Sequence, residues 1–474
     1  MFIGIDLGTS SVKTILIDHN QKILTTAHFS LTVHSPQDGY SEQDPKEWIK
    51  ATESCLKELS NNCPKEFSST ISIGISGHMH GATLLDKEGK VIRPCILWND
   101  TRSFKECLEF EDQNFDVREI SGNITMPGFT APKINWIKNN ESDNFKKIYK
   151  VLLPKDYLRY YLTGEFFSDM SDASGTLWMN IKNRVWSEKL LNASFLTEDE
   201  MPTLVEGNQE AGTLKDILKD KFKFTNNVIV VGGAGDNAAS AAGLGIIEET
   251  QSFISLGTSG VFFTPNSNFL SNTKDAVHSF CHCLPNKWHL MSVMLSASNC
   301  LDWICSITGA SIDQALQNAE MFSIKKDNIL NAPYFLPYMS GERTPHNDPH
   351  VRGSFHYLKT ATNQAALQYA VVEGVSFGIL DGVNSIKSVN KNFDDIFMVG
   401  GGSRSSFWLE LLASIVNRNL SVCEQSEFGA ALGVARLAMF ADNNISNKDT
   451  IIKKIKVKES FNPDVDKIDI LEKR

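Results

Sequence analysis

The chain has 474 residues, 42% of them hydrophobic and 22% charged, which is ordinary for a globular protein, and its formal net charge is -10. That length favours two domains over a single core, and the acidic balance argues against an electrostatic nucleic-acid binder. No apolar run approaches the ~20 residues that span a bilayer, and the first residues lack the pattern of a secretion signal.

The opening stretch, MFIGIDLGTSSVKTILID, predicts a β-hairpin. Strand-forming residues lead into Asp6, small residues at 7–11 form a tight turn, and residues 12–17 are apolar again. The carboxylate therefore stands at the exit of the first strand. A surface hairpin with one solvated acid is the alternative interpretation.

A further strand is predicted at residues 71–75, and His80 lies in the segment that follows it. In α/β proteins the end of such a strand is where ligands bind, so His80 is a candidate binding residue. The alternative is a hydrogen-bonded loop histidine without a function. Trp98, further along, is by default a core residue, and it can be one while also forming the wall of a pocket.

The segment NNVIVVGGAGDNAASAAG contains a short buried strand at 228–231 and matches a dinucleotide-binding glycine pattern. We reject that interpretation because Asp236 would lie inside the phosphate cradle, where a carboxylate repels pyrophosphate. Asp236 is better suited as a general base directed into a cleft, with Asn237 beside it to hydrogen-bond a hydroxyl. A helix-capping Asp236 is the equally open alternative.

The stretch FISLGTSGVFFTP at 253–265 repeats the opening pattern, with Leu-Gly-Thr-Ser matching letter for letter. Each copy begins about one domain's length of chain, which predicts two duplicated α/β domains that each start on a hairpin. Small residues with backbone N–H groups suit phosphate oxygens, so two such tips facing across a cleft would hold a polyphosphate. The tip residues concerned are Thr9, Ser10, Thr258 and Ser259.

Only the first copy carries an acid, since Ser255 stands where Asp6 would be. This asymmetry is expected if one Mg²⁺ is held on one side, with Asp6 as its anchor. The cysteines point to no second metal. Nine cysteines without framework spacing are expected to be buried thiols in a reducing cytoplasm, and Cys281-His282-Cys283 lacks a partner pair that would complete a metal site.

A third glycine loop follows a predicted strand at 396–399 and precedes a helix from about Ser405. Three consecutive glycines allow a flat ring to approach the backbone, and a helix N-terminus adds N–H donors. We predict an adenosine pocket here, with Asp302 either near the nucleotide or capping a helix. Tight helix–sheet packing explains the small residues equally well, including those of EFGAALGVARLAMF. The candidate ATP contacts are Gly401, Gly402, Ser403 and Ser406.

The opening hairpin resembles the actin-like ATPase superfamily of sugar kinases, actin and Hsp70 chaperones. Four longer segments narrow the resemblance to the FGGY carbohydrate kinases, over about residues 2–440. Met79-His80-Gly81 with Trp98-Asn99-Asp100 most closely resembles its bacterial xylulokinase branch. The lysine-rich stretch from about 442 shows little resemblance. The four segments are 74–103, 128–140, 152–180 and 335–355.

The resemblance implies two RNase H-like domains with an interdomain cleft. Residues 1–242 would carry the sugar site and first phosphate hairpin, and residues 243–474 the second hairpin and the adenosine site. It further implies transfer of the γ-phosphoryl group of ATP to O5 of D-xylulose with Mg²⁺, by a cytoplasmic enzyme that forms a homodimer and needs no nucleic acid or membrane. Asp236 would be the base. The sugar contacts would be Met79, His80, Trp98, Asp100 and Asn237.

Two other functions stay open: a kinase for ribulose or a related ketose, and a non-catalytic actin-like ATP-binding protein that needs no sugar pocket. Two residues also depart from the xylulokinase pattern, because Ser11 and Ala234 replace glycines. Ala234 is compatible with its loop unless the backbone needs a positive φ at that position.

Overall fold

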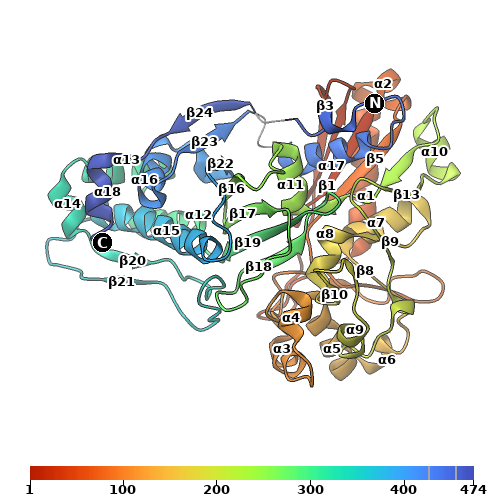
Figure 1. Ribbon diagram of the computed structural model, residues 1–474, viewed down its shortest axis with the longest axis horizontal. Helices are drawn as coiled ribbons and strands as arrows, with labels where there is room; N and C mark the ends of the chain where they lie inside the picture. The colour runs from red at the N-terminus through yellow and green to blue at the C-terminus, as the bar shows by residue number, and fades with distance from the viewer. Residues whose placement is uncertain (425–427, 454–455) are drawn as a thin grey trace. The chain divides into compact units, whose positions relative to one another are not determined.

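The computed structural model describes residues 1–424, 428–453 and 456–474 (Figure 1). The chain forms two compact units, each built from three separate segments. The first unit comprises Met1–Gly245, Phe280–Trp288 and Phe428–Lys454, and the second comprises Ile246–Ser279, His289–Glu427 and Ile455–Arg474. The chain therefore leaves the first unit after Gly245 and returns to it twice.

The sheet of the first unit begins with the predicted hairpin, which is confirmed: β1 and β2 pair antiparallel, with Leu7 opposite Val12 at the turn. The strand predicted at 71–75 is β5, which runs parallel to β1. The strand order is β13-β14-β5-β1-β2-β3, and β15 also pairs with β5. The strands are β1 (Phe2–Leu7), β2 (Ser11–Ile17), β3 (Ile23–Ser30), β5 (Ser72–Gly77), β13 (Glu210–Thr213), β14 (Ile229–Val231) and β15 (Ala234–Gly235).

The sheet of the second unit repeats this plan, and the predicted duplication is confirmed. Its first two strands, β16 and β17, form the second hairpin, and β22 runs parallel to β16 as β5 does to β1. The order is β18-β19-β17-β16-β22-β23-β24. The strands are β16 (Gln251–Leu256), β17 (Gly260–Asn266), β18 (His278–Cys281), β19 (Trp288–Met294), β22 (Asp395–Val399), β23 (Leu420–Cys423) and β24 (Val457–Phe461).

The two faces of β1 are covered in different ways. Ile3, Ile5 and Leu7 point to one face and join the core cluster that includes Trp48 of α1 (Pro45–Asn62). The other face presents Gly4, which lies beside Gly74 of β5 and receives the helix α17 (Gly429–Met439). This alternation follows from the period of two in a strand.

Helix α17 lies directly against the backbone of its neighbours. A Cβ atom on Gly4 would lie 1.9 Å from the carbonyl oxygen of Ala431 in this helix. On its second side α17 packs against α11 (Asp236–Leu244), where a Cβ on Gly433 would lie 1.8 Å from the Ala239 carbonyl (Figure 1). Of the two explanations for the small residues of this segment, close packing is observed; its first residue, Glu427, lies outside the described residues.

The core of the second unit is built around one long helix, α15 (Gln364–Lys387), with α12 (Ser298–Thr308), α13 (Ile312–Ser323) and α16 (Ser406–Val416) beside it. Tyr369 and Trp408 are fully buried in this cluster. The indole of Trp408 donates to Ser376 Oγ at 3.1 Å, so its one polar atom is satisfied inside the apolar core.

Shorter elements connect these layers, and β24 with α18 shows that the lysine-rich end of the chain is also folded. All nine cysteines are free thiols, and eight are buried as expected, whereas Cys63 is partly exposed. Within the described ranges, no helix combines the length and apolar character needed to cross a membrane. The connecting helices are α2 (Pro64–Ser68), α3 (Phe104–Glu111), α4 (Val117–Ser121), α5 (Thr130–Asn140), α6 (Ser142–Phe145), α7 (Pro154–Thr163), α8 (Met170–Ala173), α9 (Glu188–Asn192), α10 (Asp216–Phe222), α14 (Lys326–Asn331) and α18 (Val465–Leu471). The minor strands are β4 (Glu42–Gln43), β6 (Thr83–Leu85), β7 (Cys95–Ile96), β8 (Lys150–Leu152), β9 (Phe167–Asp169), β10 (Met179–Asn180), β11 (Val185–Trp186), β12 (Thr203–Val205), β20 (Tyr334–Leu336) and β21 (Ser354–His356).

Candidate active site

Two predicted carboxylates meet at one edge of the first sheet. Asp6 lies near the end of β1, and Asp236 is the first residue of α11, directly after β15. Both strands neighbour β5 and run parallel to it, so their carboxyl ends share one edge, where open α/β sheets bind ligands. Ser76 Oγ, at the end of β5, donates to Asp6 Oδ1 at 3.1 Å.

The surroundings of these carboxylates favour the protonated form. Burial raises the pKa of Asp6. Burial, followed by repulsion from Asp6, raises the pKa of Asp236 to about 6, although the amide and backbone N–H of Asn237 both donate to its Oδ1. A carboxylate with this pKa is ionised at pH 7 and can still take up a proton, which suits a general base.

The capping alternative for Asp236 is wrong. The N-cap of α11 is Gly235, and the Asp236 side chain accepts only from the adjacent Asn237 rather than from N–H groups further into the helix. The backbone of the preceding loop also shows whether a positive φ is needed at Ala234. The left-handed backbone falls on Gly233, with φ 73°, while Ala234 is an extended residue of β15.

His80 lies on a constrained backbone. Its φ is 71°, which is unusual for a residue with a side chain. Lys133 Nζ and Thr130 Oγ1, from α5, donate to its carbonyl oxygen at 2.9 and 3.1 Å. His80 Nδ1 lies 2.7 Å from the Gly175 carbonyl oxygen, which can only accept, so Nδ1 carries a proton and donates it to this contact. Strain held in this way is typical of functional sites.

Met79 connects the histidine to the carboxylates. Its side chain is buried, and a Cβ on Gly235 would lie 3.0 Å from its sulfur. The Met79 side chain therefore lies against the residue that precedes Asp236. Met79, His80 and Asp236 come from segments far apart in sequence, and the fold of the first unit brings them together.

Trp98 and Asp100 lie on one loop, and the side chains of both form hydrogen bonds with other residues of the first unit. Trp98 Nε1 donates to Thr9 Oγ1 at 3.0 Å, which links this loop to the tip of the first hairpin. Asp100 is buried, and its carboxylate accepts from Ser41 N at 2.6 Å and pairs with Arg102 at 2.7 Å. These contacts give Asp100 a structural role. Its role as a sugar contact stays a prediction.

Both hairpin tips are braced through their carbonyl groups. Gln43 donates to the Thr9 carbonyl at 2.7 Å, and Leu31 N donates to that of Ser10 at 2.8 Å. In the second unit, Ala297 N donates to the Thr258 carbonyl at 2.9 Å. Ser259 completes that tip, and Ser10 and Thr258 are exposed. Hydrogen bonds to the backbone carbonyls thus hold both tips, while Ser10 and Thr258 stay exposed, as phosphate contacts require.

The predicted adenosine site coincides with a pocket of about 720 Å³ in the second unit, a size typical of ligand sites. Gly401, Gly402 and Ser406 all line it. Ser403 does not, and its hydroxyl donates to the Gly400 carbonyl at 2.7 Å. Asp302 also lines the pocket and lies inside α12, whose N-cap is Ala297, so the capping alternative for Asp302 is wrong.

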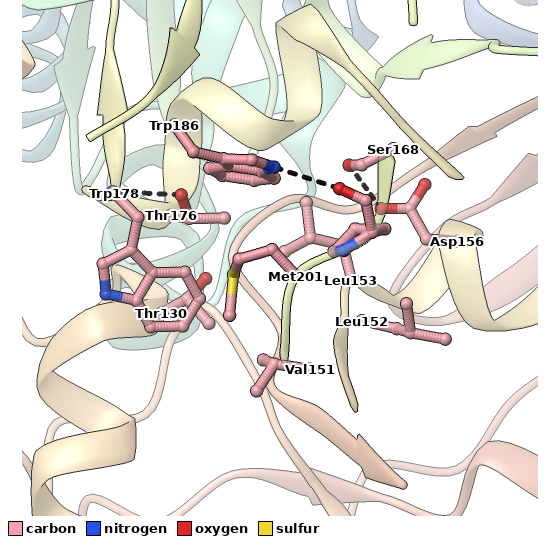
Figure 2. A pocket seen from close by; sticks show the side chains of 11 residues that line it. Thr130, Val151, Leu152, Leu153, Asp156, Ser168, Thr176, Trp178, Trp186 and Met201 are labelled. Carbon is pink, nitrogen blue, oxygen red and sulfur yellow. Dashed lines mark hydrogen bonds between the residues drawn. The ribbon is translucent and has the colours of Figure 1, made fainter. Parts of the chain in front are cut away.

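A separate small pocket lies in the first unit (Figure 2). Trp178, Trp186 and Met201 are among its lining residues, and the Trp186 indole donates to the Pro202 carbonyl at 3.0 Å. Its volume is about 10 Å³, enough for one water molecule. It is too small for a sugar.

Sequence reasoning missed several residues that support these side chains. Ser76, Lys133, Thr130 and Gly175 contact Asp6 or His80; they lie in segments that carry the family resemblance, but the sequence by itself assigns them no role at the site. Ser76 could have been noticed, because it ends a predicted strand beside the first hairpin. Lys133 and Gly175 lie about 50 and 95 residues from His80, and no local pattern connects them to it.

Comparison with known proteins identifies the family of the chain. Residues 1–243 match the N-terminal domain, and residues 252–441 the C-terminal domain, of the FGGY family of carbohydrate kinases. The chain is 44% identical to the xylulose kinase of Escherichia coli K12 over 98% of this chain and 95% of that protein. A xylulose kinase structure from Brucella ovis is 46% identical and matches with a TM-score of 0.95, covering 100% of this chain and 96% of the other.

The fold recurs in more distant structures. The xylulose kinase of Rhodospirillum rubrum is 23% identical and superposes with a TM-score of 0.91 over 100% of this chain and 96% of its own. The two duplicated α/β domains predicted from the sequence are therefore those of the sugar kinases. The chain belongs to the FGGY family of carbohydrate kinases.

Proposed function

We propose that this chain is a xylulose kinase, which transfers the γ-phosphoryl group of ATP to O5 of D-xylulose and yields D-xylulose 5-phosphate. The observation that carries the proposal is the grouping of Asp6 and Asp236 beside the Met79–His80 loop in the first unit. The similarity to xylulose kinases over nearly the whole chain supports the choice of sugar.

Asp236 is proposed as the base that takes the proton from the attacking sugar hydroxyl. Its pKa of about 6 supports this role, because the ionised form dominates at pH 7. His80, Met79 and Asn237 would hold the sugar, with the His80 ring oriented by its contact to the Gly175 carbonyl. Trp98 and Asp100 would shape the wall of this site.

Asp6 is proposed as the anchor for Mg²⁺. Two neighbouring buried carboxylates fit a divalent cation, since its charge would offset their burial and relieve the repulsion from Asp6 that contributes to the raised pKa of Asp236. Among the described residues, no three His, Cys, Asp or Glu side chains gather as a metal site, so the remaining ligands would be water and phosphate oxygens. Bound Mg²⁺ would supply charge neutralisation on the transferred phosphate.

The nucleotide is assigned to the second unit. Its adenosine would occupy the pocket lined by Gly401, Gly402 and Ser406. Thr258 and Ser259, at the hairpin tip of the same unit, would contact the phosphates. A cytoplasmic homodimer completes the proposal: nine free thiols support a reducing compartment. Light scattering of the purified protein tests the dimer.

The test is a panel of ketoses assayed for ADP release in the presence of ATP and Mg²⁺, with the phosphate position in the product read by NMR. D-Xylulose should give the highest kcat/KM and a phosphate on O5. A higher kcat/KM for D-ribulose would replace the sugar assignment. If no ketose raises ATP turnover above the rate without sugar, the kinase proposal is wrong for this chain.

A further inference from the structure

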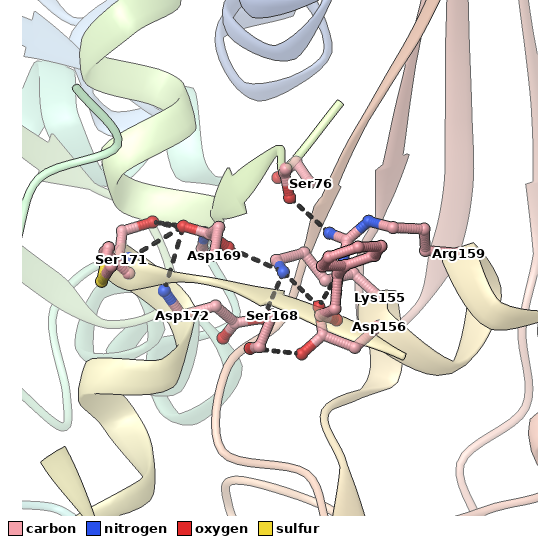
Figure 3. Close-up of polar contacts among 12 residues, drawn as sticks. Ser76, Lys155, Asp156, Arg159, Ser168, Asp169, Ser171 and Asp172 are labelled. Carbon is pink, nitrogen blue, oxygen red and sulfur yellow. Dashed lines mark hydrogen bonds and ion pairs between the residues drawn. The ribbon is translucent and has the colours of Figure 1, made fainter. Parts of the chain in front are cut away.

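A buried charged cluster of Lys155, Asp156, Asp169 and Asp172 lies in a segment that has no role in the function proposed above (Figure 3). Lys155 Nζ in α7 contacts Asp156 Oδ1 at 2.5 Å, Asp169 Oδ1 at 2.7 Å and Asp172 Oδ2 at 3.4 Å, and all four side chains are fully buried. Buried ion pairs are costly to desolvate and contribute little to stability on balance. Such a cluster calls for another explanation.

One branch of the cluster reaches the loop that carries Asp236. Asp169 Oδ2 accepts a hydrogen bond from Ser171 Oγ, and Ser171 Oγ accepts in turn from the backbone N–H of Gly235 at 3.1 Å. Gly235 is the residue directly before Asp236. The lysine charge is thus connected through a carboxylate and a hydroxyl to the backbone that positions the carboxylate of the proposed base.

A second branch holds the other end of the same loop. Arg159 Nη1 pairs with Asp156 Oδ1 at 3.0 Å, and Arg159 Nη2 donates to the Gly232 carbonyl. The turn from Gly232 to Gly235 is therefore tied at both ends to side chains of α7, β9 and α8. Fixed partners on both sides limit how far Asp236 can move relative to the sheet.

The segment that contains Ser171 also reaches the Met79–His80 loop. Four residues after Ser171, the Gly175 carbonyl accepts from His80 Nδ1 at 2.7 Å. A Cβ on Gly175 would lie 2.5 Å from His80 Nδ1 and 2.9 Å from Met79 Cε. One short stretch of chain therefore contacts both the loop of the proposed base and the loop of the proposed sugar ligand.

We propose that Ser171 and Gly175 are positioning residues for phosphoryl transfer: Ser171 sets the position of Asp236 through the Gly235 amide, and Gly175 sets that of His80. The inference rests on the proposed function, since it gives these residues a purpose only if Asp236 and His80 act on a sugar. Anchored groups of this kind matter because a misplacement of ~1 Å can cost about 10²-fold in rate.

The two residues predict different kinetic defects. Ser171→Ala removes the acceptor of the Gly235 N–H, so kcat should fall about 10- to 100-fold with the KM for ATP unchanged. Ser171→Thr keeps the hydroxyl and should recover most of the loss. Gly175→Ala displaces His80, so the KM for D-xylulose should rise about 2- to 12-fold, as expected for one weakened hydrogen bond.

Ser168→Ala is the matched control. Ser168 is equally buried, and its hydroxyl donates to Asp156 Oδ2 at 2.6 Å in the same cluster, whereas the Ser171 hydroxyl bonds the Gly235 amide. Its kcat and both KM values should stay near those of the parent. Equal losses of kcat in Ser168→Ala and Ser171→Ala would overturn the assignment, because they would mark a general structural effect.

Hydrogen exchange of the folded variants gives a readout that needs no kinase activity. In Ser171→Ala the amide of Gly235 should exchange about 3- to 10-fold faster, and in Ser168→Ala it should not. Unchanged exchange in Ser171→Ala overturns the positioning role even if the parent phosphorylates D-xylulose. Faster exchange in a parent that phosphorylates no ketose keeps the contact to the loop and overturns the proposed function instead.

Discussion

The Asp236 carboxylate lies near that of Asp6 and accepts hydrogen bonds from the next residue, Asn237. Burial and, after it, repulsion from Asp6 raise its pKa to about 6, while Asn237 limits the rise by donating two hydrogen bonds. The pKa of Asp236 therefore lies just below physiological pH, so the carboxylate is mostly ionised there and can still take up a proton. This is a property of the site and not of an isolated aspartate.

Asp236→Asn is expected to separate catalysis from binding. The amide preserves the shape of the side chain but cannot take up a proton, so kcat for D-xylulose phosphorylation should fall by at least ~10²-fold. Binding of D-xylulose, measured by calorimetry, should persist because the amide can still hydrogen-bond a hydroxyl. Turnover within a few-fold of the parent would contradict the role of Asp236 as base.

The same substitution is expected to stabilise the protein in EDTA. The pKa of Asp236 rises from its ordinary 3.8 to about 6 on folding, so the folded state holds the proton more tightly than the unfolded one. Ionisation therefore lowers the free energy of unfolding as pH rises from about 4 to about 6, and the loss is complete above that range. Thermal melts should show a Tm gain for Asp236→Asn at pH 8 that disappears near pH 4. A gain that is independent of pH would disprove this origin.

Helices α11 and α17 approach each other so closely that their contact requires glycine. At Gly433 a Cβ atom would meet the Ala239 carbonyl at 1.8 Å, a backbone atom that cannot move aside without shifting the helix. A Cβ atom on Gly429, on the same helix, would meet Ser240 only at 3.7 Å, the nearest contact among the described residues. The two positions provide a direct test of how this contact contributes to stability.

Gly433→Ala should destabilise the protein by about 1–3 kcal/mol or more, the usual cost of overpacking. Gly429→Ala is the control, and there the higher helix propensity of alanine should leave stability equal or slightly raised. Urea unfolding curves of both variants measure the difference. Similar midpoints for the two variants would mean that α17 can shift freely and that the close contact is not required.

The first unit is completed only by a segment from near the end of the chain. Helix α17 covers the glycine-lined face of β1 and β5, although 173 residues of the second unit and the short return Phe280–Trp288 separate it from Gly245. The helix that completes the first unit is thus far from the strands of its sheet in the sequence. The fold of the first unit therefore depends on residues that come after most of the second unit in the sequence.

A fragment of residues 1–245 should consequently fail to fold cooperatively. It lacks α17 and the Phe280–Trp288 segment, so one face of β1 and β5 would be exposed to water. We expect binding of a hydrophobic dye and a broad thermal transition in circular dichroism, against a sharp transition for the full chain. A sharp transition in the fragment would show that α17 adds little to the first unit.

Local patterns determined much of this protein in advance. The two hairpins, the strand before His80 and the exit of a strand at Asp236 follow from short-range rules: strand alternation, turn-forming small residues and a carboxylate at a strand end. The repeated Leu-Gly-Thr-Ser likewise indicated the duplicated sheets. Such features are decided within about ten residues, so the sequence alone reveals them.

Only the tertiary structure decided which distant residues meet. Gly175 reaches His80 across 95 residues, Ser171 reaches Gly235 across 64, and α17 returns to β1 from the far end of the chain. The raised pKa of Asp236 also needs the folded sheet, because it arises from burial and from Asp6. These contacts depend on the packing of whole elements, whose free energy is shared among many side chains, and no short stretch of sequence encodes it.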